Sequence, residues 1–254
     1  MRWTDDRLAA LDVDGGFRMR GLGTTRLETF CDAAYAFAVT LLVVAGGAIP
    51  TSYAALLTAL NDVPAFLCSF VAIAVIWLAH RQWSRRYGLE DGRTTLISLA
   101  MVFVMLVYVY PLRMVASAFM AFASGGRLPS AFVMETPADL TGLFVVYGLG
   151  FALQTAMLAA LHLLAARADG LRLDAVERLR TRHGVVANGV MAATGVASAL
   201  AAALLPTHLG IWAGFVYPTL IVTMPAIAVR YRREAERLRR ATLPGGRAGQ
   251  GPRP

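Results

Sequence analysis

Residues 26–44 read RLETFCDAAYAFAVTLLVV and determine how the chain is interpreted. The stretch opens with Arg26, carries Asp32 near its start and is otherwise almost wholly apolar. Its length is close to the roughly 20 residues that a membrane-spanning helix needs. It starts too late for a signal peptide, has no suitable small-residue cleavage site and contains an aspartate. We therefore expect a transmembrane helix that is retained in the protein.

The rest of the chain is similarly apolar. Of the 254 residues, 57% are hydrophobic and only 16% are charged, and the mean hydropathy is +0.57. Soluble domains contain about 25% charged residues, so this composition argues against a soluble protein. We expect a kink at Pro111 in the third apolar segment, because proline interrupts helical hydrogen bonding. Six segments are long and apolar enough to cross a bilayer: 28–49, 60–80, 94–123, 141–166, 184–205 and 208–229.

The positive charges, which are all arginines, alternate between successive loops. The net charge is +8, and 22 of the 24 arginines lie in four segments: the tail to residue 26, the 81–93 and 167–183 loops, and the tail from 230. Arginine-rich loops stay on the cytoplasmic side of a membrane. We therefore expect six spans with both termini in the cytoplasm, in a bacterial inner (plasma) membrane. This topology explains the positive charge, so a nucleic-acid partner is not expected.

The chain divides into three parts. We expect a cytoplasmic N-terminal tail at 1–25, a six-helix transmembrane domain at 26–229 and a basic cytoplasmic C-terminal tail at 230–254. The composition of 1–25 and 241–254 predicts loose segments. The segment 230–240 also suits an extension of the last helix into the cytoplasm that contacts anionic lipid head groups. No internal repeat is evident, so one six-helix unit makes up the chain.

Asp32 is the residue of the first helix that most needs an explanation. A carboxylate inside a membrane costs a few kcal/mol on insertion scales, so it faces protein or water and has a partner. The second helix runs the opposite way and reaches the cytoplasm just after His80, which places His80 at a similar depth. Trp77 lies one turn deeper on the same face, and Arg26 can reach the entrance. Such a network either fastens the two helices together or takes part in transport.

Thr40 has two interpretations of the same kind. Threonine in a spanning helix commonly donates its hydroxyl to the carbonyl one turn earlier. It can also line a pore. In the helix it shares one face with residues at steps of three and four: Phe30, Ala33, Phe37, Leu41 and Val44.

These residues also resemble a known family. RLETFCDAAYAFAVTLLVV resembles the Arg-x-x-x-Phe-Ser-Asp signature that opens helix one in the transmembrane protein 175 family of endosomal, lysosomal and prokaryotic potassium channels. A second block, FLCSFVAIAVIWLAHRQW at 66–83, is similar to the family's second helix. The third helix, with Pro111, is similar too, whereas the last three agree only in number and hydrophobicity. The positions that match the signature and the run after it are Arg26, Phe30, Asp32, Thr40, Leu41 and Leu42.

The resemblance implies a fold and a function. It implies an all-α polytopic membrane protein with six transmembrane helices per subunit, forming a homotetramer in which helix one lines a central pore. Potassium ions and the lipid bilayer are the implied partners, and no cofactor, metal or catalytic residue is implied. Phe37 takes the position of the main constriction, with Leu41 and Val44 lining the path beyond it. Thr40 takes the place of a hydroxyl ring linked to potassium preference.

The resemblance also implies a structural network and shows three departures. The chain contains no TVGYG filter, so a narrow hydrophobic neck, which can close by dewetting, would set selectivity. Cys31 replaces the signature serine, Phe37 replaces the usual isoleucine or leucine, and Ala100 or Ser98 stands in place of an asparagine. All three departures bear on potassium preference and conduction. The network that holds helix one in its pore-lining pose corresponds to Arg26, Phe30, Cys31, Asp32, Trp77 and His80.

Three other classes of function remain to be weighed. A proton-coupled secondary transporter would use Asp32 and His80, but such proteins usually show internal repeats and broken helices; only Gly46-Gly47 and Pro218 suggest breaks. A purely structural membrane protein is a further alternative. An intramembrane enzyme would need a nucleophile paired with a histidine, and no pair has a recognised spacing; Cys31 and Cys68 suggest neither a disulfide nor a metal site. The candidates for such pairs are Cys31, Cys68, Ser69, His80, His162, His183 and His208.

Overall fold

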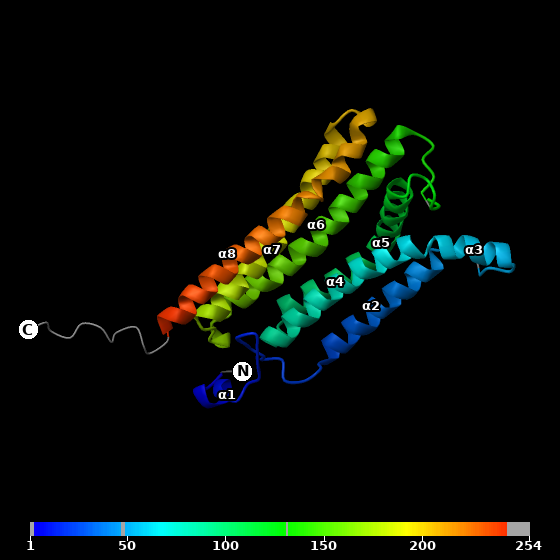
Figure 1. The fold of residues 1–254 in the computed structure, drawn as a ribbon. Helices are drawn as coiled ribbons and strands as arrows, with labels where there is room; N and C mark the ends of the chain where they lie inside the picture. The colour runs from blue at the N-terminus through cyan, green and yellow to red at the C-terminus, as the bar shows by residue number, and fades with distance from the viewer. Residues whose placement is uncertain (1–2, 47–48, 131, 243–254) are drawn as a thin grey trace, which may run out of the picture.

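A computed structural model describes residues 3–46, 49–130 and 132–242, and the tail at 243–254 that was predicted to be loose lies outside them. In this part of the chain there are eight α-helices, two 3₁₀ helices and one small antiparallel sheet (Figure 1). Six helical segments are long and apolar enough to cross a membrane. The expectation of an all-α, multi-pass membrane protein with six spans is therefore confirmed.

The six spans follow the predicted order, but several of their bounds differ, most clearly in the last two. The fifth helix begins before residue 184 because Asp174 and Glu177 form a polar capping box, which an apolar pattern does not reveal. The sixth segment is interrupted near Pro218 and then continues through the basic stretch, as expected for an extended last helix. The spans are α2 (Arg26–Val44), α4 (Val63–Tyr87), α5 (Gly92–Ala123), α6 (Pro137–Arg167), α7 (Ala175–Leu204) and η2 (Thr207–Val216) with α8 (Thr219–Thr242).

Successive spans run in opposite directions, so the bundle has two ends. The basic end is where α2, α5 and α7 begin and where α4, α6 and α8 finish. The other end, called the far end, carries the short helix α3 (Tyr53–Asn61), which the sequence did not predict and which Ser52 caps. At the basic end, η1 (Asp169–Leu171) joins α6 to α7. Figure 1 shows α6, α7 and α8 grouped together, with α4 lying between that group and α2.

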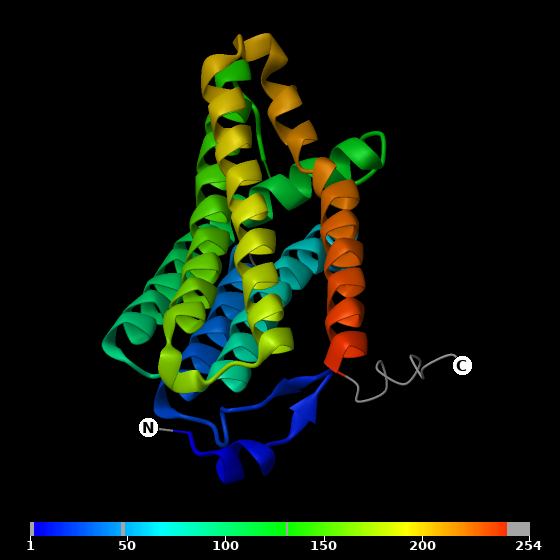
Figure 2. The same cartoon turned by 90° about the vertical axis from the view of Figure 1, so that its left-hand side faces the viewer.

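Helix α5 carries Pro111 within its length and remains one helix. The two views show that its later part turns away from the direction of its first part (Figures 1 and 2), as the predicted kink requires. Asp91 caps its beginning by accepting from the Thr94 backbone, and the hydrogen bond from the Thr94 side chain lowers the pKa of that carboxyl. Beyond Pro111, the buried Arg113 forms an ion pair with Asp62 at the start of α4.

The N-terminal region is folded where the sequence predicted a loose tail. It contains α1 (Asp5–Ala9) and a hairpin of β1 (Val13–Asp14) and β2 (Phe17–Arg18). The hairpin turn uses two glycines at positive φ, the geometry that two-residue turns favour. Figure 2 shows this region lying across the basic end of the bundle. Phe17 explains the difference, because its fully buried ring packs edge-on against Tyr87 at 5.3 Å between centroids.

Candidate pore-lining face and polar network of helix α2

Helix α2 begins at a capping box that the sequence reasoning did not single out. The Thr25 hydroxyl accepts from the backbone of Glu28 at 3.2 Å, and the Glu28 carboxylate accepts from the backbone of Thr25 at 3.1 Å. The Thr-x-x-Glu spacing is the signal that would have found it. The cap fixes the first turn of α2, and its carboxylate complements the helix dipole.

One face of α2 is buried in the core of the protomer. Its side chains pack between α4 and α5, the two long helices that α2 contacts. Cys31 is among them, so its thiol lies inside the protomer. The buried residues of this face, at steps of four, three and four, are Cys31, Tyr35, Ala38 and Leu42.

The opposite face of α2 is exposed although it is apolar. Phe30 is 54% exposed, Phe37 is 56% exposed and Val44 is 68% exposed. Ala33 and Thr40 lie on the same face and are exposed as well. A contiguous apolar face of this kind marks a contact with lipid or with another protein surface. This exposed stripe corresponds to the face that the sequence predicted, with one exception.

The exception is Leu41. Its side chain is half-buried and packs against the core of the protomer instead of joining the exposed stripe. Val43, at 58% exposed, lies beside Val44 in its place. The difference arises because Leu41 follows Thr40 by one residue, which is 100° around the helix at 3.6 residues per turn. Leu41 therefore lies at the edge of the stripe, between the exposed face and the core.

Thr40 shows the common local bond of a helical threonine. Its hydroxyl donates to the carbonyl oxygen of Ala36 at 3.2 Å, one turn earlier. The hydroxyl oxygen retains acceptor capacity after donating that bond. Since Thr40 is exposed, this polar oxygen lies among the apolar side chains of the stripe. Both interpretations of Thr40 are thus compatible with its position.

Asp32 lies on the protein side of α2 and bonds across to α4. The Trp77 indole donates to Asp32 Oδ1 at 2.7 Å. His80, which the sequence placed at the same depth as Asp32, pairs instead with Ser98 Oγ on α5 at 3.0 Å and is almost fully buried. Asp32 and His80 nevertheless line the same cavity of about 280 Å³ at the basic end. The network therefore joins three helices, α2, α4 and α5.

Three of the six residues expected in the network lie elsewhere: Cys31 is buried in the hydrophobic core of the protomer, and the other two are on the exposed face. Arg26 and Phe30 are exposed and take no part in the bonds among Asp32, Trp77 and His80. Arg81 joins instead, with its guanidinium 5.5 Å from the centre of the Trp77 ring. Cation–π contacts of this kind are favoured over indole rings. Among the described residues of one subunit, the network thus consists of Asp32, Trp77, Arg81, His80 and Ser98.

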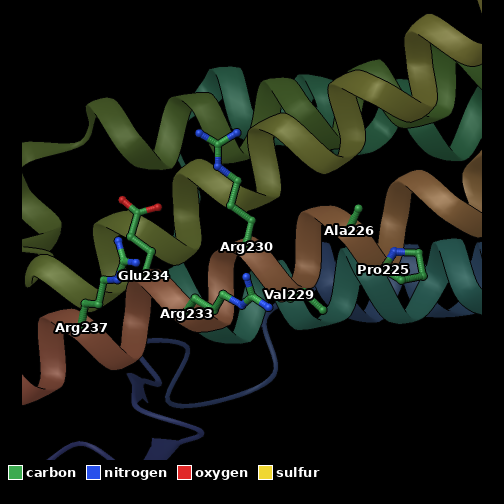
Figure 3. Close-up of a pocket in the computed structure, with 7 residues that line it drawn as sticks. All are labelled: Pro225, Ala226, Val229, Arg230, Arg233, Glu234 and Arg237. Atoms are coloured by element: carbon green, nitrogen blue, oxygen red, sulfur yellow. The ribbon is translucent and has the colours of Figure 1, made fainter.

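A groove of about 780 Å³ lies on α8, outside this site. It combines apolar side chains with three arginines and one glutamate along an exposed face (Figure 3). Its net positive charge would repel a cation, so it does not suit a cation pathway. Its residues are Pro225, Ala226, Val229, Arg230, Arg233, Glu234 and Arg237.

The groups weighed as catalytic or metal-binding have other roles here. The described ranges contain no cluster of three or more His, Cys, Asp or Glu side chains able to hold a metal. His162 Nδ1 donates to the carbonyl oxygen of Leu158 at 2.8 Å, and His183 stacks near Tyr231 with centroids 4.6 Å apart. Cys31 and Cys68 are free thiols.

The fold and the site define the class of protein: an α-helical, multi-pass membrane protein with a partly buried polar network beside the exposed apolar face of its first span. Comparison with known proteins gives the family. The sequence profile of the endosomal/lysosomal potassium channel TMEM175 matches residues 26–111. A protein of Marivirga tractuosa named as a potassium channel is 32% identical over 210 residues, which cover 80% of this chain and 82% of that protein. The chain belongs to the TMEM175 family of potassium channels, not to a family of enzymes.

A solved structure agrees with this assignment. The crystal structure of a variant of the potassium channel MtTMEM175, in complex with a nanobody fusion protein, superposes with a TM-score of 0.75. The two sequences are 29% identical, and the match covers 89% of this chain and all of that one. The likeness therefore extends through the last three helices, where the sequence resemblance was weakest.

Proposed function

We propose that this chain forms a passive, potassium-preferring cation channel, a homotetramer in which α2 of each subunit lines a central pore. One observation carries the proposal: the exposed apolar stripe of α2, which faces away from the α4 and α5 helices that bury its other side. Membership of a potassium-channel family supports an ion pathway there. In a membrane helix such exposed apolar side chains contact either lipid or another copy of the chain, and the proposal assigns those of α2 to a second copy.

The stripe has the chemistry of a narrow hydrophobic neck with one polar layer. Phe37 is the main constriction, and Val44 lines the path about 10 Å further along, at 1.5 Å per residue. The Thr40 hydroxyl oxygens lie one turn from Phe37 and offer acceptors to a partly dehydrated cation. Leu41 supports the constriction from its half-buried position. An apolar ring of this kind gates an ion path by dewetting.

The network behind α2 serves the pore by holding the helix in place. Trp77 and Asp32 join α2 to α4, and His80 and Ser98 join α4 to α5. Bonded polar groups in an apolar interior fix one arrangement of helices, because any shift leaves a group unsatisfied. The arginine-rich basic end lies in the cytoplasm by the positive-inside rule. This places the network near the cytoplasmic entrance, in a bacterial inner membrane with both termini inside.

Ion flux in liposomes tests the proposal. Purified protein is reconstituted with a potassium gradient, and flux is followed for the wild type and for Phe37→Ala, which should pass ions faster or with less selectivity. Mass measurement in detergent should give four subunits. A monomer, or no flux from either folded protein, would refute the channel. Flux that saturates and follows a pH gradient would instead indicate a proton-coupled transporter that uses Asp32 and His80.

A further inference from the structure

The N-terminal strap, defined as residues 3–24, contacts α7 and α4 and then leads into the beginning of α2. It lies across the basic end (Figure 2) and runs directly into the Thr25 cap. Helix α2 itself packs mainly on α4 and α5. A residue of α7 that holds the strap can therefore act on α2 through the chain rather than by direct packing.

Glu177 of α7 anchors the strap. Its side chain is 0% exposed, and its two carboxylate oxygens accept from Arg20 Nη1 at 3.0 Å and Nη2 at 2.8 Å. Arg18 donates to the same carboxylate through its Nε, its Nη2 and its backbone N–H, at 2.8–3.0 Å. Arg20 is itself buried, so this bidentate pair is shielded from solvent. The anchor is consequently a specific, fully bonded contact and not a surface ion pair.

The strap then lies closely along the end of α4. The Gly21 backbone donates to the carbonyl of Arg85 at 3.0 Å. A Cβ at Gly21 would lie 2.9 Å from the Ser84 carbonyl oxygen, and a Cβ at Gly88 would lie 2.8 Å from that of Arg20. Two glycines are therefore needed for this close approach. After Gly21 the chain has only three residues, Leu22 to Thr24, before the cap of α2.

Because the connection from Gly21 to Thr25 is short, a displacement of the strap is passed on to the beginning of α2. Four residue steps separate Gly21 from Thr25, and an extended chain spans at most about 3.6 Å per residue. The α4 and α7 attachments of the strap lie on the side of the subunit away from the exposed stripe, since α2 buries its other face against α4 and α5. An anchored strap of this length therefore limits how far the beginning of α2 can move toward the axis that the stripe would face.

We propose that Glu177 is a positioning residue for the pore: through Arg18 and Arg20 it fixes the strap that keeps the beginning of α2 retracted and the channel able to conduct. This inference rests on the proposed function, because it assigns α2 to the pore wall. Slackening the strap allows the helices to approach one another, which favours the dewetted state of the neck.

Lengthening the strap separates this role from a role in folding. Three residues, Gly-Ser-Gly, are inserted between Leu22 and Gly23, where Leu22 is largely exposed and Gly23 has open space around it. The Glu177 anchor and the α4 contacts stay intact. Potassium flux should fall at least threefold at unchanged thermal stability. The same insertion between Gly125 and Gly126, in the far-end turn, is the matched control and should leave flux unchanged.

Glu177→Gln is the second variant. Removing its charge weakens the pair with Arg18 and Arg20, so flux should fall as it does for the longer strap. Asp5→Asn, which removes only the exposed ion pair between Asp5 and Arg172, serves as its control and should behave as the wild type. If the wild type conducts and the insertion variant conducts equally well, the inference is overturned.

Amide hydrogen exchange gives a readout that does not depend on conduction. In the insertion variant, exchange in the first two turns of α2 should rise at least threefold, because the strap no longer restrains them. Unchanged exchange would also overturn the inference. A wild type that passes no ions refutes the proposed function alone, since increased exchange would still show that the strap restrains α2.

Discussion

Trp77 on α4 donates its indole N–H to Asp32 on α2 across 2.7 Å, so a hydrogen bond crosses between the first two spans. Of the two partners, the Asp32 carboxylate loses more free energy when it is left without a hydrogen bond. An ionised group in an apolar setting loses the full benefit of its solvation unless a donor replaces water. The bond therefore explains how this helix can carry an aspartate behind its exposed stripe.

Replacing Trp77 and replacing Asp32 should lower the free energy of unfolding by different amounts. Trp77→Phe leaves the Asp32 carboxylate without its donor, at a cost to unfolding free energy of about 1–3 kcal/mol. Asp32→Asn keeps an oxygen acceptor for the indole and should cost less. Thermal or denaturant unfolding in detergent checks the order. Equal losses for the two variants would mean that the bond contributes little and that ring packing dominates.

Phe37 and Leu42 lie five residues apart but face opposite sides of α2. Phe37→Ala should increase ion flux or reduce selectivity while leaving the subunit folded, because the ring is 56% exposed within it. Leu42→Ala is the control for loss of side-chain volume. Leu42 is fully buried, so its truncation should destabilise the subunit by about 2–5 kcal/mol without widening the neck. Flux and unfolding measured on both variants separate the two effects.

Thr40 gives a test of the polar layer. Thr40→Val keeps the shape of the side chain and removes the hydroxyl, so potassium preference over sodium should fall severalfold. Thr40→Ser keeps the oxygen and should retain most of that preference. The measurement is the reversal potential under potassium and sodium gradients across a planar bilayer. Preference that is retained by both variants would assign selectivity to the apolar neck alone.

Much of this architecture follows from sequence because the membrane simplifies it. Length, hydropathy and arginine placement predict six antiparallel spans, since lipid requires apolar helices and charge marks the loops. The spacing of Phe30, Phe37 and Val44 predicts that they share one face, and the family resemblance implies that this face is not packed inside the protomer. Helix periodicity did not determine whether Leu41 is exposed, because a side chain at the edge of a face can point either toward the core or away from it.

The folded N-terminal region shows what local patterns miss. Residues 1–25 look loose because their composition is polar and rich in glycine and arginine. From residue 3 onward this region is held by distant contacts, among them that of Arg20 with Glu177, which lies 157 positions later in the chain. Ser98 was missed as the partner of His80 for a related reason. It was noted only as a departure from the family pattern, and depth alone could not tell which helix His80 would face.

The ion pair of Arg113 and Asp62 allows a final test, at the far end of the subunit. Arg113 is buried in α5, and its guanidinium also lies 5.9 Å from the centre of the Phe66 ring. The Asp62 side chain is 20% exposed and retains some access to water.

Asp62→Ala should therefore cost more stability than Arg113→Met, because it leaves a buried charge without a counter-ion, an effect of about 3–5 kcal/mol. Arg113→Met replaces the guanidinium with an apolar chain of similar length, and the remaining carboxylate can still be hydrated. Unfolding of both variants in detergent measures the order, and a greater loss from Arg113→Met would show that the cation–π and packing contacts of the arginine outweigh the ion pair.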